Sequence, residues 1–217
     1  MTEGFFTDYP LFYSNSRVGT KPPRLAKRHT VLIEQQSDLI AGKRVLDIAS
    51  HDGRWSFAAL KAGASHVTGI ELCPELVSTA ESTFKQYGIP KTDYRFMTGD
   101  FFDVAPKLEG HFDTVFLFGF LYHTLKHAEL FYNISRLKPG TIIVDTRVAL
   151  VPGPYIEIKK DPAPVGYPTV DAVSMILSYL GYGSEIVDWQ PYLGDNCDGV
   201  HDYASGTRVT IIGRRRK

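Results

Sequence analysis

Short apolar runs and longer amphipathic stretches alternate along most of the chain. The apolar runs predict strands at residues 44–48, 66–70, 94–98, 112–118 and 141–148. Between and around them, apolar side chains recur at helical spacing, which predicts helices over 24–40, 55–62, 74–87, 127–137 and 170–180. Strands of continuous apolar residues, separated by helices, are typical of a parallel sheet that is covered on both faces. The pattern therefore predicts an α/β, doubly wound fold.

The C-terminal third of the chain follows a different pattern. Residues 151–168 are rich in proline and glycine, which predicts a loop that crosses the sheet edge. Residues 185–189 and 207–213 predict two strands with no helix between them, joined by a long loop over 191–206. We therefore expect a mostly parallel, seven-stranded sheet with a final antiparallel strand.

The length favours a single domain over residues 1–217, because single cores stop growing only beyond roughly 250 residues. Within it we expect three parts: an aromatic arm and helix over 1–41, a core over 42–148, and loops with the C-terminal strands over 149–217. The arm holds many aromatic rings, so it is expected to pack irregularly over the body of the protein.

The charge balance limits the kinds of partner. The chain holds 24 basic and 24 acidic side chains, whereas a partner such as DNA calls for a surplus of lysine and arginine. No stretch approaches 18 consecutive apolar residues, so no membrane partner is expected. Two cysteines suit a reducing compartment, and the N-terminus lacks a signal-peptide pattern. We expect a cytoplasmic protein, and the sequence leaves its oligomeric state open.

Residues that can do chemistry gather where the predicted strands end. In open α/β sheets a ligand binds outside the carboxyl ends of the strands, where the strand order reverses. Glu71, at the end of the second strand, is placed to accept hydrogen bonds from ribose hydroxyls. Asp100, after the third strand, is placed to accept from an exocyclic amine, and Phe101 offers a face for a purine ring.

Three ordered segments resemble the class I S-adenosylmethionine-dependent methyltransferases. They are VLDIASHDGRWSFAALKAGASHVTGIEL, MTGDFFD and FDTVFLFGFLYHTLKHAELFYNISRLKPGTIIVDT, and the resemblance covers residues 42–148. It implies a Rossmann-like methyltransferase fold, S-adenosyl-L-methionine (SAM) as cofactor and S-adenosyl-L-homocysteine (SAH) as product.

The resemblance also implies roles for individual residues around the cofactor. The methionine part is expected at Asp47 and at the loop of Ala49, Ser50, His51, Asp52 and Gly53. The ribose is expected at Glu71, the adenine at Asp100 and Phe101, and Gly119 completes the cofactor-binding set.

The loop after the first strand departs from the family pattern. Two positions that are usually glycine are Ala49 and His51, and only Gly53 keeps its place. Alanine is tolerable there if its φ stays negative, whereas the larger His51 must either splay the loop or form a wall. A nicotinamide dinucleotide needs the second glycine for its pyrophosphate, so this loop favours SAM.

Two residues are candidates for catalysis. His123 follows the fourth strand, where the transferred methyl group should point, and it would act either as the general base or as a wall of the cofactor pocket. Asp145, after the fifth strand, would orient that histidine, take the proton itself or ligate a metal.

The sequence does not decide whether the activity depends on a metal ion. Oxygen-bearing side chains cluster in the late loop, at Asp195, Asn196, Asp198, His201 and Asp202. They are of the kind that binds Mg²⁺, although an exposed turn has the same composition, and the turn is the favoured interpretation.

The acceptor is the least specified part. The N-terminal arm and the late loop supply seven rings that could form its binding surface, although core positions are the favoured interpretation for most of them: Phe5, Phe6, Tyr9, Tyr13, Trp189, Tyr192 and Tyr203. Rings with nearby carboxylates and carboxamides suit a carbohydrate, and in size and layout the chain is similar to small sugar O-methyltransferases, such as those of methylmannose polysaccharide synthesis. We therefore expect O-methylation of a small polar acceptor, a sugar or oligosaccharide. The alternatives are a methyltransferase that modifies a tRNA base and a non-catalytic SAM-binding protein.

Overall fold

The computed structural model describes residues 4–14 and 22–216. Seven strands form one sheet: β1 (Arg44–Ile48), β2 (His66–Glu71), β3 (Tyr94–Thr98), β4 (Thr114–Phe118), β5 (Thr141–Arg147), β8 (Tyr182–Ile186) and β9 (Arg208–Arg215). The order is β3-β2-β1-β4-β5-β9-β8, and β9 runs antiparallel to both of its neighbours. The predicted doubly wound fold with one antiparallel strand at the end of the chain is confirmed.

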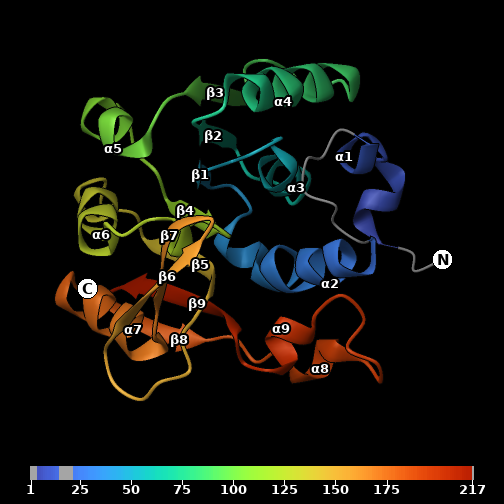
Figure 1. Cartoon of the computed structure of the whole chain (residues 1–217). Coiled ribbons are helices and arrows are strands. Elements are labelled where there is room, and N and C mark those ends of the chain that lie inside the picture. The colour runs from blue at the N-terminus through green and yellow to red at the C-terminus, as the bar shows by residue number, and fades with distance from the viewer. Residues whose placement is uncertain (1–3, 15–21, 217) are drawn as a thin grey trace.

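Helices cover both faces of the sheet (Figure 1). One face is covered by α2 (Pro22–Leu32), α3 (Arg54–Lys61) and α4 (Pro74–Gln86), together with the short helices α1 (Leu11–Ser14), α8 (Gln190–Leu193) and α9 (His201–Ala204). The other face is covered by α5 (Phe101–Val104), α6 (His127–Arg136) and α7 (Val170–Tyr179). Four 3-10 turns complete the chain: η1 (Phe5–Asp8), η2 (Glu34–Leu39), η3 (Ala105–Lys107) and η4 (Leu121–His123).

The two cores follow from strand periodicity. Successive side chains of a strand point to opposite faces, so Val45 packs with the helices α2 to α4 and Leu46 packs with α5 to α7. Strands buried on both faces must be apolar throughout, which is why their sequences read as continuous runs. The strand order reverses between β1 and β4, and this point defines the crevice for a ligand.

Three predictions for the connecting segments were wrong. Residues 151–168 hold a separate hairpin of β6 (Ile156–Asp161) and β7 (Ala163–Pro168), not a loop. Its prolines are compatible with strands because a two-stranded hairpin has only edges, where a missing N–H costs little. Residues 191–206 contain α8 and α9, and the helix expected over 24–40 ends at Leu32, followed by the 3-10 turn η2.

The β6–β7 hairpin lies next to the residues that follow β4. Strand β7 packs against η4, and the rings of Tyr122 and Tyr167 meet edge to face with their centroids 5.9 Å apart. The hairpin thus flanks the residues that follow β4.

Candidate functional site

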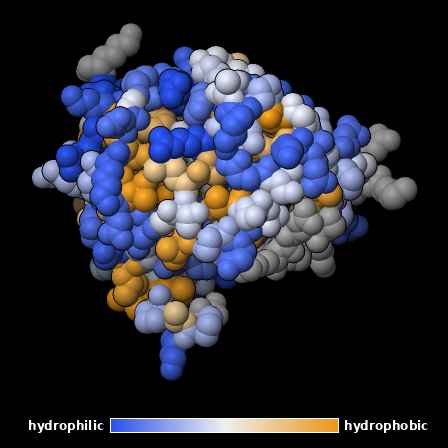
Figure 2. Space-filling model, turned by 90° about the horizontal axis from the view of Figure 1, so that it is seen from above, coloured by the Kyte–Doolittle hydropathy of each residue, from blue (hydrophilic) through white to orange (hydrophobic). Residues whose placement is uncertain are grey.

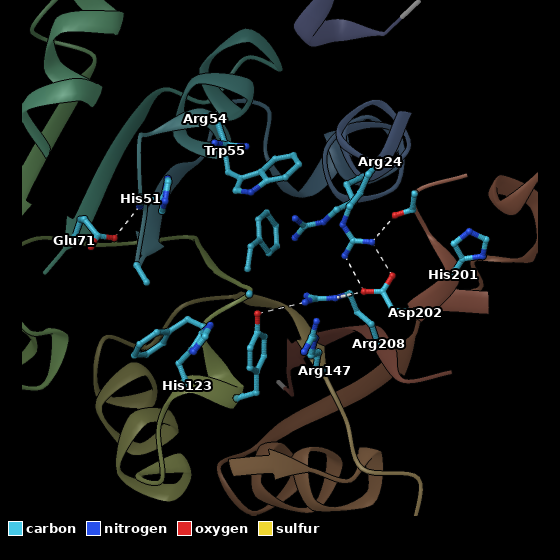
Figure 3. Close-up of a pocket in the computed structure, with 17 residues that line it drawn as sticks. Arg24, His51, Arg54, Trp55, Glu71, His123, Arg147, His201, Asp202 and Arg208 are labelled. Atoms are coloured by element: carbon cyan, nitrogen blue, oxygen red, sulfur yellow. Dashed lines mark hydrogen bonds and ion pairs between the residues drawn. The ribbon is translucent and has the colours of Figure 1, made fainter. Parts of the chain in front are cut away.

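A cavity of about 710 Å³ opens at the carboxyl ends of β1 and β4. One half is lined by Ala49, His51, Glu71, Gly119 and Phe120, which come from the ends of β1, β2 and β4. We call it the cofactor half. The other half reaches η4, the end of β5, α2 and α9. We call it the acceptor half, and Figure 3 shows the two on opposite sides, with Glu71 and His51 across the site from Arg24 and Asp202.

The loop after β1 adopts the backbone conformation that glycine would give it. Ala49 has a φ of 58° and His51 a φ of 54°, both in the left-handed region. The condition of a negative φ, under which an alanine is tolerated without strain, is therefore not met at Ala49. Left-handed backbone costs a residue with a Cβ about 1 kcal/mol, and such strain concentrates at functional sites. Of the two alternatives for His51, the structure shows the wall, since its side chain lines the cavity.

Glu71 links this loop to the end of β2. Its Oε2 accepts from the backbone N–H of His51 at 2.9 Å, and its Oε1 accepts from that of Cys73 at 3.0 Å. Each carboxylate oxygen has a second lone pair, and the side chain lines the cavity. The carboxylate is thus held in a fixed orientation with acceptor capacity left for the hydroxyls of a ligand.

Three other predicted cofactor residues lie beneath the cavity wall. Asp47, Ser50 and Asp52 are each 1% exposed. Asp47 accepts from the hydroxyl of Ser56 at 2.7 Å, and its burial raises the pKa to about 7. Asp52 pairs with Arg54 through both oxygens, at 2.7 and 2.8 Å. Burial alone would raise the pKa of Asp52, but hydrogen bonds and charge from His51 and Arg54 hold it below its ordinary value.

The expected adenine contacts lie outside the cavity. Asp100 is exposed and caps α5, accepting from the N–H of Phe102 at 3.0 Å. Phe101 is 4% exposed and belongs to the core beneath the sheet. In this structure Phe101 therefore presents no face to a purine ring, because its ring is needed to fill the core.

The cofactor half fits SAM in its chemistry, and the whole cavity has the size of a small-molecule site. The open side of this half is at Gly119, where φ is 78° and an added Cβ would meet no atom within 4 Å. Glu71 would hold the ribose hydroxyls, and the left-handed loop at Ala49 and His51 would lie against the methionine part.

Asp145 is a structural centre rather than a part of the cavity wall. It is completely buried. Its Oδ1 accepts from Arg28 at 2.9 Å and from Arg208 at 2.7 Å, and its Oδ2 accepts from the hydroxyls of Tyr203 at 2.6 Å and Thr210 at 3.2 Å.

The surroundings of Asp145 do not suit a base. Burial would raise its pKa, but the charges of Arg28 and Arg208 and the Tyr203 hydrogen bond hold it below its ordinary value. A carboxylate with this low pKa and with both oxygens occupied is a poor proton acceptor. The geometry thus does not support the catalytic role expected for Asp145, whereas His123 does line the cavity.

The residues that sequence reasoning missed are arginines. Arg24, Arg28, Arg54, Arg147 and Arg208 all line the cavity, and they come from elements far apart in the sequence. In the sequence each is an ordinary basic residue balanced by acidic ones elsewhere. Only the fold brings them to one place, so no local signal could have identified them.

The expected acceptor rings have another role. Phe6, Trp189 and Tyr203 are buried, and Phe5, Tyr9, Tyr13 and Tyr192 pack against the same core. Trp189 stacks on Tyr203 with 3.5 Å between ring centroids. None of these seven rings lines the cavity.

The described residues include no group of three or more His, Cys, Asp or Glu side chains that could hold a metal ion. Asp202, from the polar cluster of the late loop, instead pairs with Arg24 at 2.7 and 2.8 Å. Among the helices of the described segments, none has the length and apolar character to cross a membrane.

Comparisons with known proteins agree with this architecture. Residues 45–140 match the family model described as a methyltransferase domain. The S-adenosylmethionine-dependent methyltransferase from Mesorhizobium loti superposes with a TM-score of 0.63 at 17% identity, covering 81% of this chain and 92% of that one. The magnesium protoporphyrin IX methyltransferase from Synechocystis PCC 6803, crystallised with SAM, gives 0.63 at 17% identity over 97% and 91% of the two chains. The chain thus has the fold of the SAM-dependent methyltransferases and a methyltransferase domain over residues 45–140.

Among curated proteins, the chain is similar to tRNA U34 carboxymethyltransferases. The protein from Pseudomonas fluorescens (strain Pf0-1) is 31% identical over 111 residues, which are 50% of this chain and 34% of that protein. That from Geobacter sp. (strain M21) is 27% identical over 154 residues, 66% of this chain and 46% of that protein. The matched parts thus span only about a third to a half of these relatives.

Proposed function

We propose that the protein transfers the methyl group of SAM to a hydroxyl oxygen of a small polar acceptor, with His123 as the general base. The observation that carries the proposal is one continuous cavity that joins Glu71 and the β1 loop to His123 and the polar residues of the acceptor half. A sugar or oligosaccharide hydroxyl stays a candidate acceptor, although the seven rings of the arm and the late loop lie in the core or pack against it.

The chain's own residues would supply orientation and a proton acceptor. When bound, SAM supplies an electrophilic methyl group on a sulfonium that leaves as a neutral thioether. Glu71 and the β1 loop would fix the cofactor, so that acceptor and methyl group meet in line, and alignment supplies much of such a rate. The imidazole of His123, beside the ring of Tyr122 at 4.2 Å between centroids, would accept the proton of the attacking hydroxyl.

A second candidate is transfer to tRNA, as the names of the curated relatives suggest. The observation in its favour is the row of arginines in the acceptor half, because a nucleic-acid backbone and a carboxylate-bearing transferred group are both anionic. The balanced charge of the whole chain speaks against a large polyanion.

The test of His123 uses transfer of labelled methyl from SAM to a panel of sugars, hydroxy acids, sugar phosphates and unmodified tRNA. With a small hydroxylated acceptor, His123→Ala should lower kcat about 100-fold or more, the range in which general bases contribute. The matched control is His111→Ala, because His111 pairs with Asp113 on the surface and does not line the cavity.

Three results would speak against this proposal. Transfer to tRNA with none to any small hydroxyl would favour the second candidate. Undiminished transfer by His123→Ala would leave His123 as a pocket wall, and a protein that binds SAH yet transfers nothing would be a non-catalytic binding protein.

A further inference from the structure

The acceptor half carries more positive charge than its carboxylates balance. Four arginines line it, Arg24, Arg28, Arg147 and Arg208. The carboxylates that pair with them in the described part of the chain are Asp145 and Asp202. Four guanidinium groups against two carboxylates leave an excess of two positive charges. Arg28 and Arg208 are largely buried, where unpaired charge is costly, whereas Arg147 is exposed at the rim.

Both terminal nitrogens of Arg24 are occupied by partners within the protein. Its guanidinium makes a bidentate salt bridge with the carboxylate of Asp202, at 2.7 and 2.8 Å, and also donates to the carbonyl of Gly199 at 2.6 Å. Asp202 also accepts from Arg208 Nε at 2.9 Å. Burial would raise the pKa of Asp202, but these two arginines hold it at about 2. Asp202 thus stays charged and positions Arg24 and Arg208.

Arg28 has donor capacity that the protein does not use. It shares one oxygen of Asp145, Oδ1, with Arg208. Its Nε is buried, and among the described residues it has no hydrogen-bond partner. Its guanidinium lies 5.0 Å from the centroid of the Trp55 ring, within cation–π distance. A buried donor left without a partner costs free energy unless a ligand satisfies it.

Arg147 has no carboxylate within ion-pair distance in the described structure. It makes a long contact of 3.4 Å to the hydroxyl of Tyr167 on the β6–β7 hairpin. Its guanidinium lies 5.6 Å from the ring of Tyr122, and that of Arg208 lies 5.5 Å from the same ring. Arg147 and Arg208 therefore both approach Tyr122, the neighbour of His123, and Figure 3 shows them on the same side of the cavity.

We propose that Arg28, Arg147 and Arg208 form a subsite for an oxyanion, the phosphate or carboxylate of the methyl acceptor. Planar guanidinium groups match both anions through paired N–H donors. The subsite lies beside Tyr122 and His123, so an acceptor held by its anionic group would present a hydroxyl close to the proposed base. The inference rests on the proposed function and narrows its acceptor from a neutral sugar to an anionic hydroxylated molecule.

The subsite can be tested by thermal unfolding without a known acceptor. The probes are inorganic phosphate and malonate, each compared with sodium chloride at equal ionic strength. At ten times its Kd, either anion should raise Tm by about 3 °C. A larger shift with phosphate would indicate a phosphorylated acceptor, and a larger shift with malonate a carboxylate.

The variants are Arg28→Met and Arg147→Met, which remove the charge and keep much of the side-chain length. Both variants should lose the rise in Tm that the anion causes, which is measured for each variant against its own Tm in chloride. Arg147→Met removes no partner of Asp145, because Asp145 pairs with Arg28 and Arg208. The matched control is Arg95→Met on β3, an exposed arginine away from the cavity, which should keep the full shift.

A repeat with saturating SAH separates this inference from the proposed function. If the subsite belongs to the acceptor, the shifts from SAH and from the anion should add. Competition between them would mean that the arginines face the donor, and equal Tm in phosphate, malonate and chloride would mean that no such subsite exists. Either result overturns the inference, whereas loss of SAH binding itself would contradict the proposed function.

Discussion

Asp145→Ala is expected to lower the free energy of unfolding by about 3–5 kcal/mol. The substitution leaves Arg28 and Arg208 buried without their shared carboxylate and removes the acceptor of the Tyr203 hydroxyl. Breaking a buried ion pair on one side is among the most destabilising single changes. Urea unfolding followed by circular dichroism measures the loss, and Asp103→Ala on the exposed surface of α5 is the control, with an expected change within about 0.5 kcal/mol.

The same carboxylate predicts a pH dependence. The pKa of Asp145 is lower in the folded protein than its ordinary value near 4, so the unfolded chain binds the proton more readily. Its contribution to stability is therefore complete above about pH 5 and is lost as the pH falls through the unfolded pKa toward the folded pKa. Asp145→Asn should reduce the decline in stability between pH 5 and pH 3, and an unchanged decline would mean that other carboxylates dominate it.

Gly53→Ala is expected to be the second large loss, about 2–4 kcal/mol. Gly53 has a φ of 76°, which costs a residue with a Cβ about 1 kcal/mol. An added Cβ would also lie 2.8 Å from Phe96 and 3.0 Å from Ala80, and overpacking of this kind costs about 1–3 kcal/mol. The predicted glycine of the loop is thus required by the packing of β3 and α4 against it.

The matched control for Gly53 is Gly42→Ala. Gly42 has a φ of 72°, but an added Cβ would meet no atom within 4 Å. It should cost only the backbone strain, about 1 kcal/mol, so the difference between the two variants isolates the steric contact. Equal losses in both would show that the loop relaxes to accept the extra methyl group.

The sheet could be predicted because burial on both faces leaves a local signal. The run at 44–48 coincides with β1, since a strand inside a parallel sheet admits few polar residues. The sequence did not predict the hairpin β6–β7, because the hairpin lies outside the seven-stranded sheet and most of β6 is exposed. Its charged residues, such as Lys159 and Lys160, are exposed, and its prolines are typical of a loop. An edge with little burial does not impose an apolar pattern.

The cofactor half was predictable in the same way, and the acceptor half was not. Ala49, His51 and Glu71 follow strands whose ends meet at one edge, so order along the chain fixes their neighbourhood. Arg28 and Arg208 come from α2 and β9, 180 positions apart, and meet only because both reach Asp145. Asp145 was recognised as important, but only its burial and its partners distinguish a positioning carboxylate from a base.

The exposed apolar side chains are concentrated on a few elements. Figure 2 shows orange patches among blue, hydrophilic residues on the face seen from above. Leu150, Tyr155 and Ile158 are exposed around the β6–β7 hairpin, and Tyr179 on α7 is 90% exposed. The hairpin also holds Tyr167 beside Tyr122, so its position affects the acceptor half.

The central claim is that the cavity binds SAM through Glu71 and places its methyl group at the acceptor half. Calorimetric titration with SAH tests it most directly, with the wild-type chain, Glu71→Ala and the exposed control Glu109→Ala. The account predicts a single site in the wild type and the control, and an affinity about 10- to 100-fold lower in Glu71→Ala, because charge-assisted hydrogen bonds contribute about 1.5–3 kcal/mol each. Absence of SAH binding by a folded wild-type chain, or equal affinity in Glu71→Ala, would contradict it.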